Sequence, residues 1–351
     1  VAAAQRALTD SGILSDDYDP LRIGVSFNSD TMWTTPDELV EGIRKCSSEG
    51  KQFDFSRWAT EGMTHMNPLW QLKYLPNMPA AHVAILNNLR GPNNSITLRE
   101  GGNGAVLGET FHIISDGRAD AMLVGGVGTR LHPLKLIHAI QHDQLVNEDC
   151  DPATASRPFD LNRIGMVPGE GAAAIVVETL ESALARGATI HAELLGGSYN
   201  ASVALSPTGT QGRRREAITS SLKAALLHTN LKTEEVGHIS AHGLATETCD
   251  IEEADAIRAV FGDTADKVPV TAPKSFFGNL GGGTSMVELI AGIESLKNDR
   301  LIASPTYKTP DPKCPLNVVH EDGIPSGRTM VQIGVASLGQ ASVAVVSRFE
   351  G

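Results

Sequence analysis

Three short stretches of the chain carry side chains that could do chemistry. Glu100 precedes a glycine-rich stretch at 101–104, His242 follows an apolar run, and Lys274 stands five residues ahead of Asn279. An imidazole can exchange a proton near neutral pH, whereas ammonium and carboxamide groups donate hydrogen bonds. A carboxylate at the start of a helix is stabilised in its ionised form by backbone N–H groups. Each residue alone is also typical of a capping or structural role, so the chemistry depends on what the fold brings together.

Two further carboxylates and one thiol are candidate neighbours of these groups. Glu253 and Glu288 are candidate partners for the Lys274 ammonium. Cys249 lies beside acidic residues, which would raise the pKa of its thiol, so we interpret it as buried or unreactive. The sequence has no His/Cys/Asp cluster with metal-ligand spacing, no P-loop, and no GxSxG or GxGxxG motif in a strand–turn–helix setting. We therefore predict no metal site.

Short apolar runs alternate with longer alanine-rich segments along the whole chain. Predicted strands cover residues 22–27, 121–126, 172–177, 238–241, 268–271, 330–335 and 342–349. Predicted helices cover residues 1–8, 180–186, 215–227, 251–261 and 286–297, and an amphipathic stretch covers 104–117. This alternation predicts parallel sheets covered by helices on both faces. Such sheets form their sites at the carboxyl ends of strands, which is where His242 is expected.

The composition argues against several classes of protein. The 351 residues are 41% hydrophobic and carry a formal net charge of −12, which supports a large core and argues against bulk binding of nucleic acid or anionic membranes. No apolar run approaches the ~18 residues that indicate a membrane-spanning helix. The four cysteines are scattered without a CxxC motif, so we expect a reducing, cytoplasmic location. The run Arg213–Arg215 is either a solvated helix start or an anion-docking patch.

The chain begins at Val1, inside a predicted helix, so we expect it to be a fragment of a longer protein. The best internal boundary is the turn at 186–188, which predicts an N-terminal half at 1–188 and a C-terminal half at 189–351. No low-complexity linker separates the halves, so one compact body is expected. Similar strand and helix patterns occur in both halves, although too loosely to establish a repeat by themselves.

The most specific sequence signal is Ala155–Asp160 (ASRPFD), followed by Arg163, Gly165 and Gly169–Gly171. This segment resembles the ASRPFD…R.G…GEGA segment of the β-ketoacyl-acyl-carrier-protein synthases, or ketosynthases, of the thiolase superfamily. Further segments similar to family motifs extend the resemblance over essentially the whole chain: Ala241–Gly243 with Thr246, Asp250 and Glu253, and Lys274–Ser275 through Glu288.

This resemblance implies a particular α/β architecture, the thiolase fold. Two similar halves form a five-layer αβαβα sandwich of mixed, mostly parallel sheets. It also implies that one strand and one helix are missing at the start of the chain. The missing part would hold the central strand of the first half and a basic segment that docks the acidic carrier protein.

The resemblance also assigns roles to the residues singled out above. The family's nucleophilic cysteine falls at Glu100 and its second catalytic histidine at Asn279, whereas His242 and Lys274 are retained. The remaining assigned positions are Thr246, Glu253 and Glu288 as supporting residues, and Val335 and Gly339 in the gate and oxyanion loop at 335–341.

The two replacements remove groups that the family's reaction needs. Condensation requires a thiolate that accepts the acyl chain and then releases it. A carboxylate is a far poorer acyl acceptor, and loss of a catalytic nucleophile can cost on the order of 10⁶ in rate. Asn279 can donate a hydrogen bond but cannot exchange a proton. We therefore expect this chain not to carry out Claisen condensation.

Three functions stay open. The first is a chain-length-factor-like subunit of fatty acid or polyketide biosynthesis, although such factors usually carry Gln where this chain has Glu100. The second is residual acyltransferase, malonyl decarboxylase or thioester hydrolase activity based on His242 and Lys274. The third is an active 3-oxoacyl-acyl-carrier-protein synthase with an atypical site. The resemblance implies acyl-carrier protein as a partner, its phosphopantetheine as substrate carrier, no other cofactor, and a homodimer or a heterodimer with an active ketosynthase.

Overall fold

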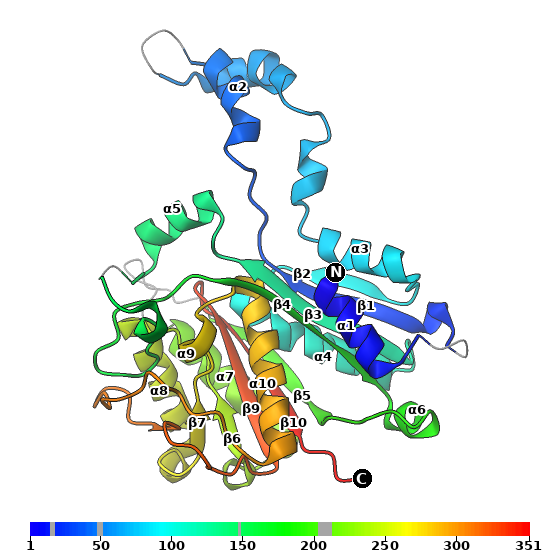
Figure 1. Cartoon of the computed structure of the whole chain (residues 1–351), viewed down its shortest axis with the longest axis vertical. Coiled ribbons are helices and arrows are strands. Elements are labelled where there is room, and N and C mark those ends of the chain that lie inside the picture. The colour runs from blue at the N-terminus through cyan, green and yellow to red at the C-terminus, as the bar shows by residue number, and fades with distance from the viewer. Residues whose placement is uncertain (15–17, 48–51, 147–148, 203–212) are drawn as a thin grey trace.

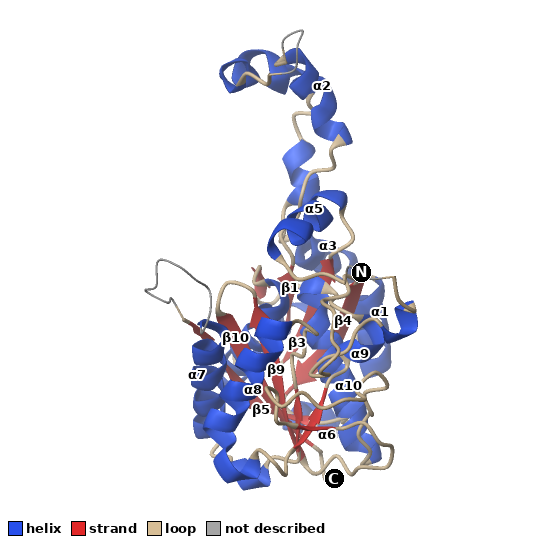
Figure 2. Cartoon of the chain, turned by 90° about the vertical axis from the view of Figure 1, so that its left-hand side faces the viewer, coloured by secondary structure: helices blue, strands red, loops and turns tan. Residues whose placement is uncertain are grey.

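Two β-sheets with helices between and outside them form the body, and a thin extension rises from one end of it (Figure 1, Figure 2). The computed structural model describes residues 1–14, 18–47, 52–146, 149–202 and 213–351. Among the described helices, none combines the length and the apolar character that a bilayer crossing requires. The described residues also contain no group of three or more His, Cys, Asp or Glu side chains that could hold a metal ion.

The first sheet contains four strands in the order β2–β1–β3–β4. They are β1 (Ile23–Ser29), β2 (Asn93–Ile96), β3 (Ala121–Thr129) and β4 (Glu170–Glu178). β1 pairs in parallel with β2 and β3, and β4 is antiparallel to β3. All seven residues of β1 are buried, as expected for a strand with both faces covered.

The second sheet contains six strands in the order β5–β10–β9–β6–β7–β8. They are β5 (Glu193–Ala201), β6 (His238–Ser240), β7 (Pro269–Thr271), β8 (Asn317–Val318), β9 (Thr329–Ala336) and β10 (Gln340–Ser347). β6 is parallel to β7 and β9, and β7 is parallel to β8, whereas β10 is antiparallel to β5 and β9. Most pairings of the described strands are therefore parallel, which confirms the mixed sheets that the resemblance implies.

The parallel pairing that the alternation of strands and helices predicts is wrong for β4, β5 and β10, which are antiparallel to their neighbours. Residues 337–339 join β9 to β10, and three residues cannot make the crossover that a parallel pair needs. The four described strands of the first sheet are hydrogen-bonded to one another without a break from β2 to β4.

Three layers of helices enclose the two sheets and complete the expected five-layer sandwich. The central layer consists of α4 (Gly102–Ser115) and α10 (Thr284–Asn298), which contact strands of both sheets. The outer layers contain α1 (Ala2–Ser11) and α3 (Met78–Asn87) on the first sheet, and α7 (Arg213–His228) and α8 (Glu247–Phe261) on the second. A Cβ atom at Gly104 of α4 would lie 2.6 Å from the Cβ of Ser342, so only glycine permits this close approach of helix and strand.

Three further helices follow strands β3, β4 and β7: α5 (Pro133–His142), α6 (Leu180–Ala185) and α9 (Lys274–Phe277). Every strand and helix predicted from the sequence is present within about one helical turn of its expected bounds. The side chains of these elements are buried in three hydrophobic clusters. Burial requires apolar residues at regular spacing, and that spacing is the pattern from which the elements were predicted.

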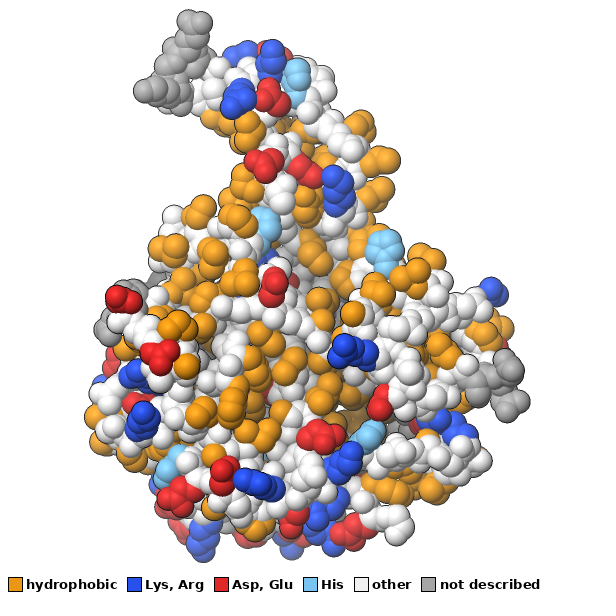
Figure 3. Space-filling model, viewed as in Figure 1, with side chains coloured by type: hydrophobic (Ala, Val, Ile, Leu, Met, Phe, Trp, Pro, Cys, Tyr) orange, Lys and Arg blue, Asp and Glu red, His pale blue; other side chains and the backbone are white. Residues whose placement is uncertain are grey.

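The extension is a feature that the sequence did not predict. Its described residues between 31 and 77 leave the body after β1 and return to it before α3, with α2 (Asp37–Lys45) near the far end (Figure 1). Phe55 and Leu69 are 76% and 64% exposed, and Figure 3 shows further hydrophobic side chains along it. Clustered exposed apolar side chains are typical of a surface that another protein covers.

A separate apolar groove of about 550 Å³ follows the free edge of β4. Side chains of α1, α4 and α10 form its walls. None of the site residues predicted from the sequence lines this groove, so it is distinct from the candidate active site.

Candidate active site

The side chains with candidate chemistry lie in segments that follow parallel strands. Glu100 follows β2, His242 follows β6, and Lys274 follows β7. Glu100 is 2% exposed and lies in the turn Arg99–Gly101 in front of α4. The Nδ2 atom of Asn279, from the second half, donates a hydrogen bond to Glu100 in the first half. The candidate site therefore lies where the two halves meet, at the carboxyl ends of their strands.

Glu100 is held by a buried ion pair with Arg130. The Nε atom of Arg130 lies 3.1 Å from Oε1 of Glu100, and its Nη2 atom also bonds the same oxygen. Asn279 Nδ2 is 2.8 Å from this oxygen, and Ser285 Oγ donates to the Glu100 carbonyl at 2.7 Å. Burial raises the pKa of a carboxyl, but the charge and hydrogen bonds of Arg130 outweigh it and lower the pKa of Glu100 to about 2. The side chain is therefore an ionised carboxylate throughout the physiological pH range.

Arg130 is the site residue that the sequence reasoning missed. It lies directly after β3, is 9% exposed, and also approaches Asp143 at 3.5 Å. The sequence did contain a signal, because a cation that follows a largely apolar strand at its carboxyl end occupies the same kind of position as His242. Its partner lies 30 residues earlier in the chain, so spacing alone did not connect them.

All polar atoms of the Asn279 side chain are already engaged. Its Oδ1 atom accepts from the Gly281 N–H at 2.9 Å and from Thr284 Oγ1 at 3.1 Å. Its Nδ2 atom donates to Glu100 and lies 2.9 Å from Sδ of Met166. Asn279 thus tightens the contact with Glu100 and has no hydrogen-bonding atom left over for a substrate.

His242, Lys274 and Glu288 form a second buried group. The Nζ atom of Lys274 lies 2.7 Å from Oε1 of Glu288 and 3.3 Å from Nδ1 of His242. Burial lowers the pKa of His242 well below its ordinary value, and the nearby Lys274 ammonium lowers it further. Because Nδ1 of this neutral ring faces a donor, the proton is on Nε2. Burial raises the pKa of Glu288 to about 7, against the opposing effect of Lys274.

Glu253 has a different role from the one expected. Its carboxylate accepts hydrogen bonds from the backbone N–H groups of His242, at 2.6 Å, and Gly243, at 2.8 Å. Burial raises the pKa of Glu253 to about 7, and these hydrogen bonds limit the rise. Of the two carboxylates expected to pair with Lys274, Glu288 does so, and the expectation was wrong for Glu253. Glu253 instead orients the loop that carries His242.

The remaining supporting residues anchor this same loop. Thr246 is buried at the start of α8, and its carbonyl accepts from Nε of Arg163 at 3.3 Å. Asp250 accepts from the Phe159 N–H at 2.8 Å and from the Leu244 N–H at 2.9 Å. The ASRPFD segment therefore contributes structure around the site rather than reacting groups.

The predicted gate loop lies beside residue 100. Val335 is buried at the end of β9, and Gly339 adopts φ +89°, a conformation that favours glycine in the turn to β10. Ser337, between them, accepts a hydrogen bond from Nη1 of Arg99 at 3.2 Å. This contact connects the loop to the residue that precedes Glu100.

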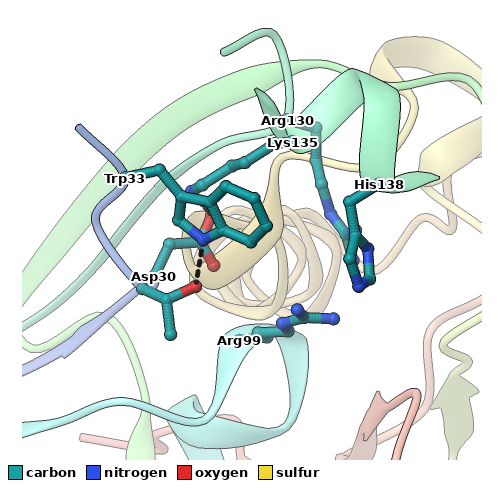
Figure 4. A pocket seen from close by; sticks show the side chains of 7 residues that line it. Asp30, Trp33, Arg99, Arg130, Lys135 and His138 are labelled. Atoms are coloured by element: carbon teal, nitrogen blue, oxygen red, sulfur yellow. Dashed lines mark hydrogen bonds and ion pairs between the residues drawn. The ribbon is translucent and has the colours of Figure 1, made fainter. Parts of the chain in front are cut away.

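A small polar pocket opens next to Glu100 (Figure 4). The space that it offers is about 10 Å³, which is room for about one water-sized ligand. Its lining comes from the end of β1, the turn before α4, the end of β3, and α5: Asp30, Thr31, Trp33, Arg99, Arg130, Lys135 and His138. A space of this size has no room for an acyl chain.

The comparisons with known proteins agree with this architecture. Residues 1–183 match the family described as Beta-ketoacyl synthase, N-terminal domain, and residues 191–308 match Beta-ketoacyl synthase, C-terminal domain. The chain is 30% identical to the 3-oxoacyl-[acyl-carrier-protein] synthase 2 of Synechocystis sp. and 32% identical to the putative polyketide beta-ketoacyl synthase 1 of Streptomyces cyaneus. Each alignment spans 321 residues, which is 91% of this chain and 73% of the relative.

Among solved structures, the chain is similar to the ishigamide ketosynthase/chain length factor, with a TM-score of 0.80 and 26% identity. That similarity covers 100% of this chain and 81% of the solved chain. The sandwich architecture, the motif segments around the site and both domain matches all indicate the same family. The chain has the thiolase fold and belongs to the β-ketoacyl synthase family of fatty acid and polyketide biosynthesis.

Proposed function

We propose that this chain is a condensation-deficient, chain-length-factor-like subunit that pairs with an active ketosynthase. The single observation that carries this proposal is the buried ion pair of Glu100 with Arg130 at the position of the family's nucleophile. A subunit with this site supplies the fold and a partner surface, while the active ketosynthase supplies the thiolate.

The chemistry of the site supports this assignment in two ways. The Glu100 carboxylate is ionised, and the Arg130 guanidinium and the Asn279 amide both bond its Oε1 atom, which makes a group that is already a poor nucleophile weaker still. Cys249 and Cys314 are buried, and burial raises the pKa of each thiol, so neither replaces the missing nucleophile.

The surface of the molecule supports a partner role. The extension exposes apolar side chains, and the similar ishigamide protein is a ketosynthase/chain length factor. We infer that the partner is a cytoplasmic ketosynthase, that acyl-carrier protein delivers the chain on its phosphopantetheine, and that this subunit uses no cofactor of its own.

The test is co-expression with an active ketosynthase from the same source. We expect a stable heterodimer by size-exclusion chromatography and mass spectrometry, and products whose chain length differs from that of the ketosynthase alone. The matched control is the His242→Ala variant, which removes the imidazole and leaves Glu100 and Arg130 in place. If this subunit acts only through its structure, the His242→Ala variant should change the product chain length as the unmodified subunit does. Formation of homodimers only, with unchanged products, refutes the proposal.

A second candidate function is hydrolysis or decarboxylation of a thioester substrate. The observation in its favour is the neutral His242 ring, whose Nε2–H can donate to a developing oxyanion. Release of carbon dioxide or free acid that disappears in His242→Ala would support this function. Rates equal to those in buffer would exclude it.

A further inference from the structure

The pocket beside Glu100 has an excess of basic side chains. Three cations line it, Arg99, Arg130 and Lys135, against one carboxylate, Asp30. Two of these cations have acidic partners: Arg130 pairs with Glu100 and Asp143, and Lys135 lies 3.1 Å from Asp30. Arg99 is the remaining cation, and among the described residues no carboxylate forms an ion pair with it.

Arg99 is partly buried and lines the pocket, and one hydrogen bond is described for its side chain. A guanidinium carries five N–H donors, and the described partner of this one is the Ser337 hydroxyl at 3.2 Å. A hydroxyl is neutral and leaves the charge of the guanidinium unmatched. Figure 4 shows the Arg99 guanidinium on one side of the pocket, with the His138 ring and the Arg130 side chain across from it.

The backbone of Arg99 is held in an unusual conformation. Its φ is +49°, in the left-handed region, which a non-glycine residue adopts at a cost of about 1 kcal/mol or more. The Asn28 Nδ2 atom donates to the Arg99 carbonyl at 2.7 Å and helps to hold this conformation. Strained residues of this kind concentrate at ligand clamps and functional sites. This backbone conformation places the Arg99 side chain in the lining of the pocket.

The opposite wall of the pocket is aromatic and polar. The Trp33 and His138 rings meet edge to face with centroids 5.8 Å apart, and the Trp33 indole N–H donates to Thr31 Oγ1 at 3.3 Å. These contacts fix the Trp33 ring and leave the His138 imidazole as a further donor. The pocket thus presents cationic and neutral donors around a space for one small ligand atom.

We propose that this pocket binds an oxyanion, one oxygen of a carboxylate or phosphate group, with Arg99 as the main ligand. The volume of about 10 Å³ accepts one oxygen atom, and the rest of the ligand would lie at the open mouth. A bound oxygen matches the Arg99 charge by a charge-assisted hydrogen bond. Arg99 also donates a hydrogen bond to Ser337 in the gate loop. A ligand that binds Arg99 would therefore alter the contact that connects this loop to residue 99. This site is independent of the partner role proposed above.

The test measures anion binding with sodium malonate and with inorganic phosphate, in separate titrations followed by tryptophan fluorescence and calorimetry. Sodium chloride at equal ionic strength is the salt control. We expect saturable binding of at least one oxyanion, and the Trp33→Phe variant should lose the fluorescence change but retain the heat of binding. The two titrations distinguish a carboxylate ligand from a phosphate ligand.

The matched variants are Arg99→Gln and Arg118→Gln, the second being an exposed arginine outside the pocket. Arg99→Gln should weaken oxyanion binding at least tenfold, and Arg118→Gln should leave it unchanged. Phenylglyoxal labelling of the unmodified protein gives a second readout that does not depend on a variant folding. Malonate or phosphate should slow the labelling of Arg99 and not that of Arg118. Binding no stronger than that of chloride, equal affinity in both variants, or no protection of Arg99 overturns the proposal.

Discussion

Replacing Arg130 by methionine tests the central feature of this site. Methionine keeps much of the volume of the side chain and removes its charge. The pKa of Glu100 lies at about 2, against an ordinary value of 4.5, because of Arg130. At about 1.4 kcal/mol per pKa unit, ionised Glu100 contributes about 3 kcal/mol to the free energy of unfolding at neutral pH. Because the folded pKa is lowered, this contribution is complete above about pH 4.5 and is lost as the pH falls toward 2.

Arg130→Met leaves a buried carboxylate without its counter-charge. Removal of one partner of a buried ion pair costs about 3–5 kcal/mol, so we expect a loss of that size at pH 7. Burial is then the main influence on Glu100, opposed by weaker contributions such as the Asn279 hydrogen bond, and it raises the folded pKa of Glu100 above 4.5. The sign of the pH dependence therefore reverses, and the variant loses stability as the pH rises above about 4.5. The double variant Arg130→Met/Glu100→Gln should recover most of the loss.

The assay is urea unfolding at several pH values between 4 and 8, followed by circular dichroism. The matched control is Arg328→Met, which breaks an exposed ion pair with Glu350 and should cost less than about 1 kcal/mol. Two results would refute the reasoning. One is a loss in Arg130→Met no larger than in the control, and the other is a double variant no more stable than the single one.

Four further predictions follow from the site. Glu100→Cys alone should not restore condensation, measured as product formed from acyl- and malonyl-carrier protein, because Asn279 cannot exchange protons; product formation by this single variant would contradict that view. Glu288→Gln should lower the free energy of unfolding by about 3–5 kcal/mol, since it leaves Lys274 buried without a counter-charge, whereas Glu294→Gln in an exposed pair should change it by less than about 1 kcal/mol. The pKa values of Glu253 and Glu288 are raised to about 7, so the free energy of unfolding should fall as the pH rises from 5 to 8; constant or rising stability over that interval would exclude these shifts. A thiol reagent should modify the partly exposed Cys150 well before the buried Cys249 and Cys314, as peptide mapping can show, and equal rates would mean that the core opens readily.

The positions of the elements could be predicted because buried strands and core-facing helices leave regular apolar patterns. The strand at Ala121–Thr129 and the helix at Thr284–Asn298 are examples. Strand direction could not be predicted in the same way. A buried strand such as β10 is equally apolar in a parallel or an antiparallel pair, and only its connection and its neighbours decide which one forms. The extension was missed because most of its side chains are exposed and its helices are short.

Most residues of the candidate site could be predicted from the sequence, but their contacts could not. His242 and Lys274 could be singled out because each follows an apolar strand. The partner of Lys274 could not be chosen, since Glu253 and Glu288 are both buried acids within reach of the same segments. The packing of α8 places Glu253 against the backbone N–H groups of residues 242–243, and the packing of α10 places Glu288 against the Lys274 ammonium.

By itself, the sequence determined that no sulfur stands at position 100 and that an amide stands at position 279, which is enough to argue against condensation. The tertiary structure alone decided how the carboxylate is held. A helix N-terminus supplies only partial charges, whereas folding brings the full charge of Arg130 from the end of a neighbouring strand into contact with Glu100. Coulomb attraction grows as two charges approach, and the hydrogen bonds of an ion pair form only in direct contact, so chain topology rather than spacing in the sequence decides which charges pair.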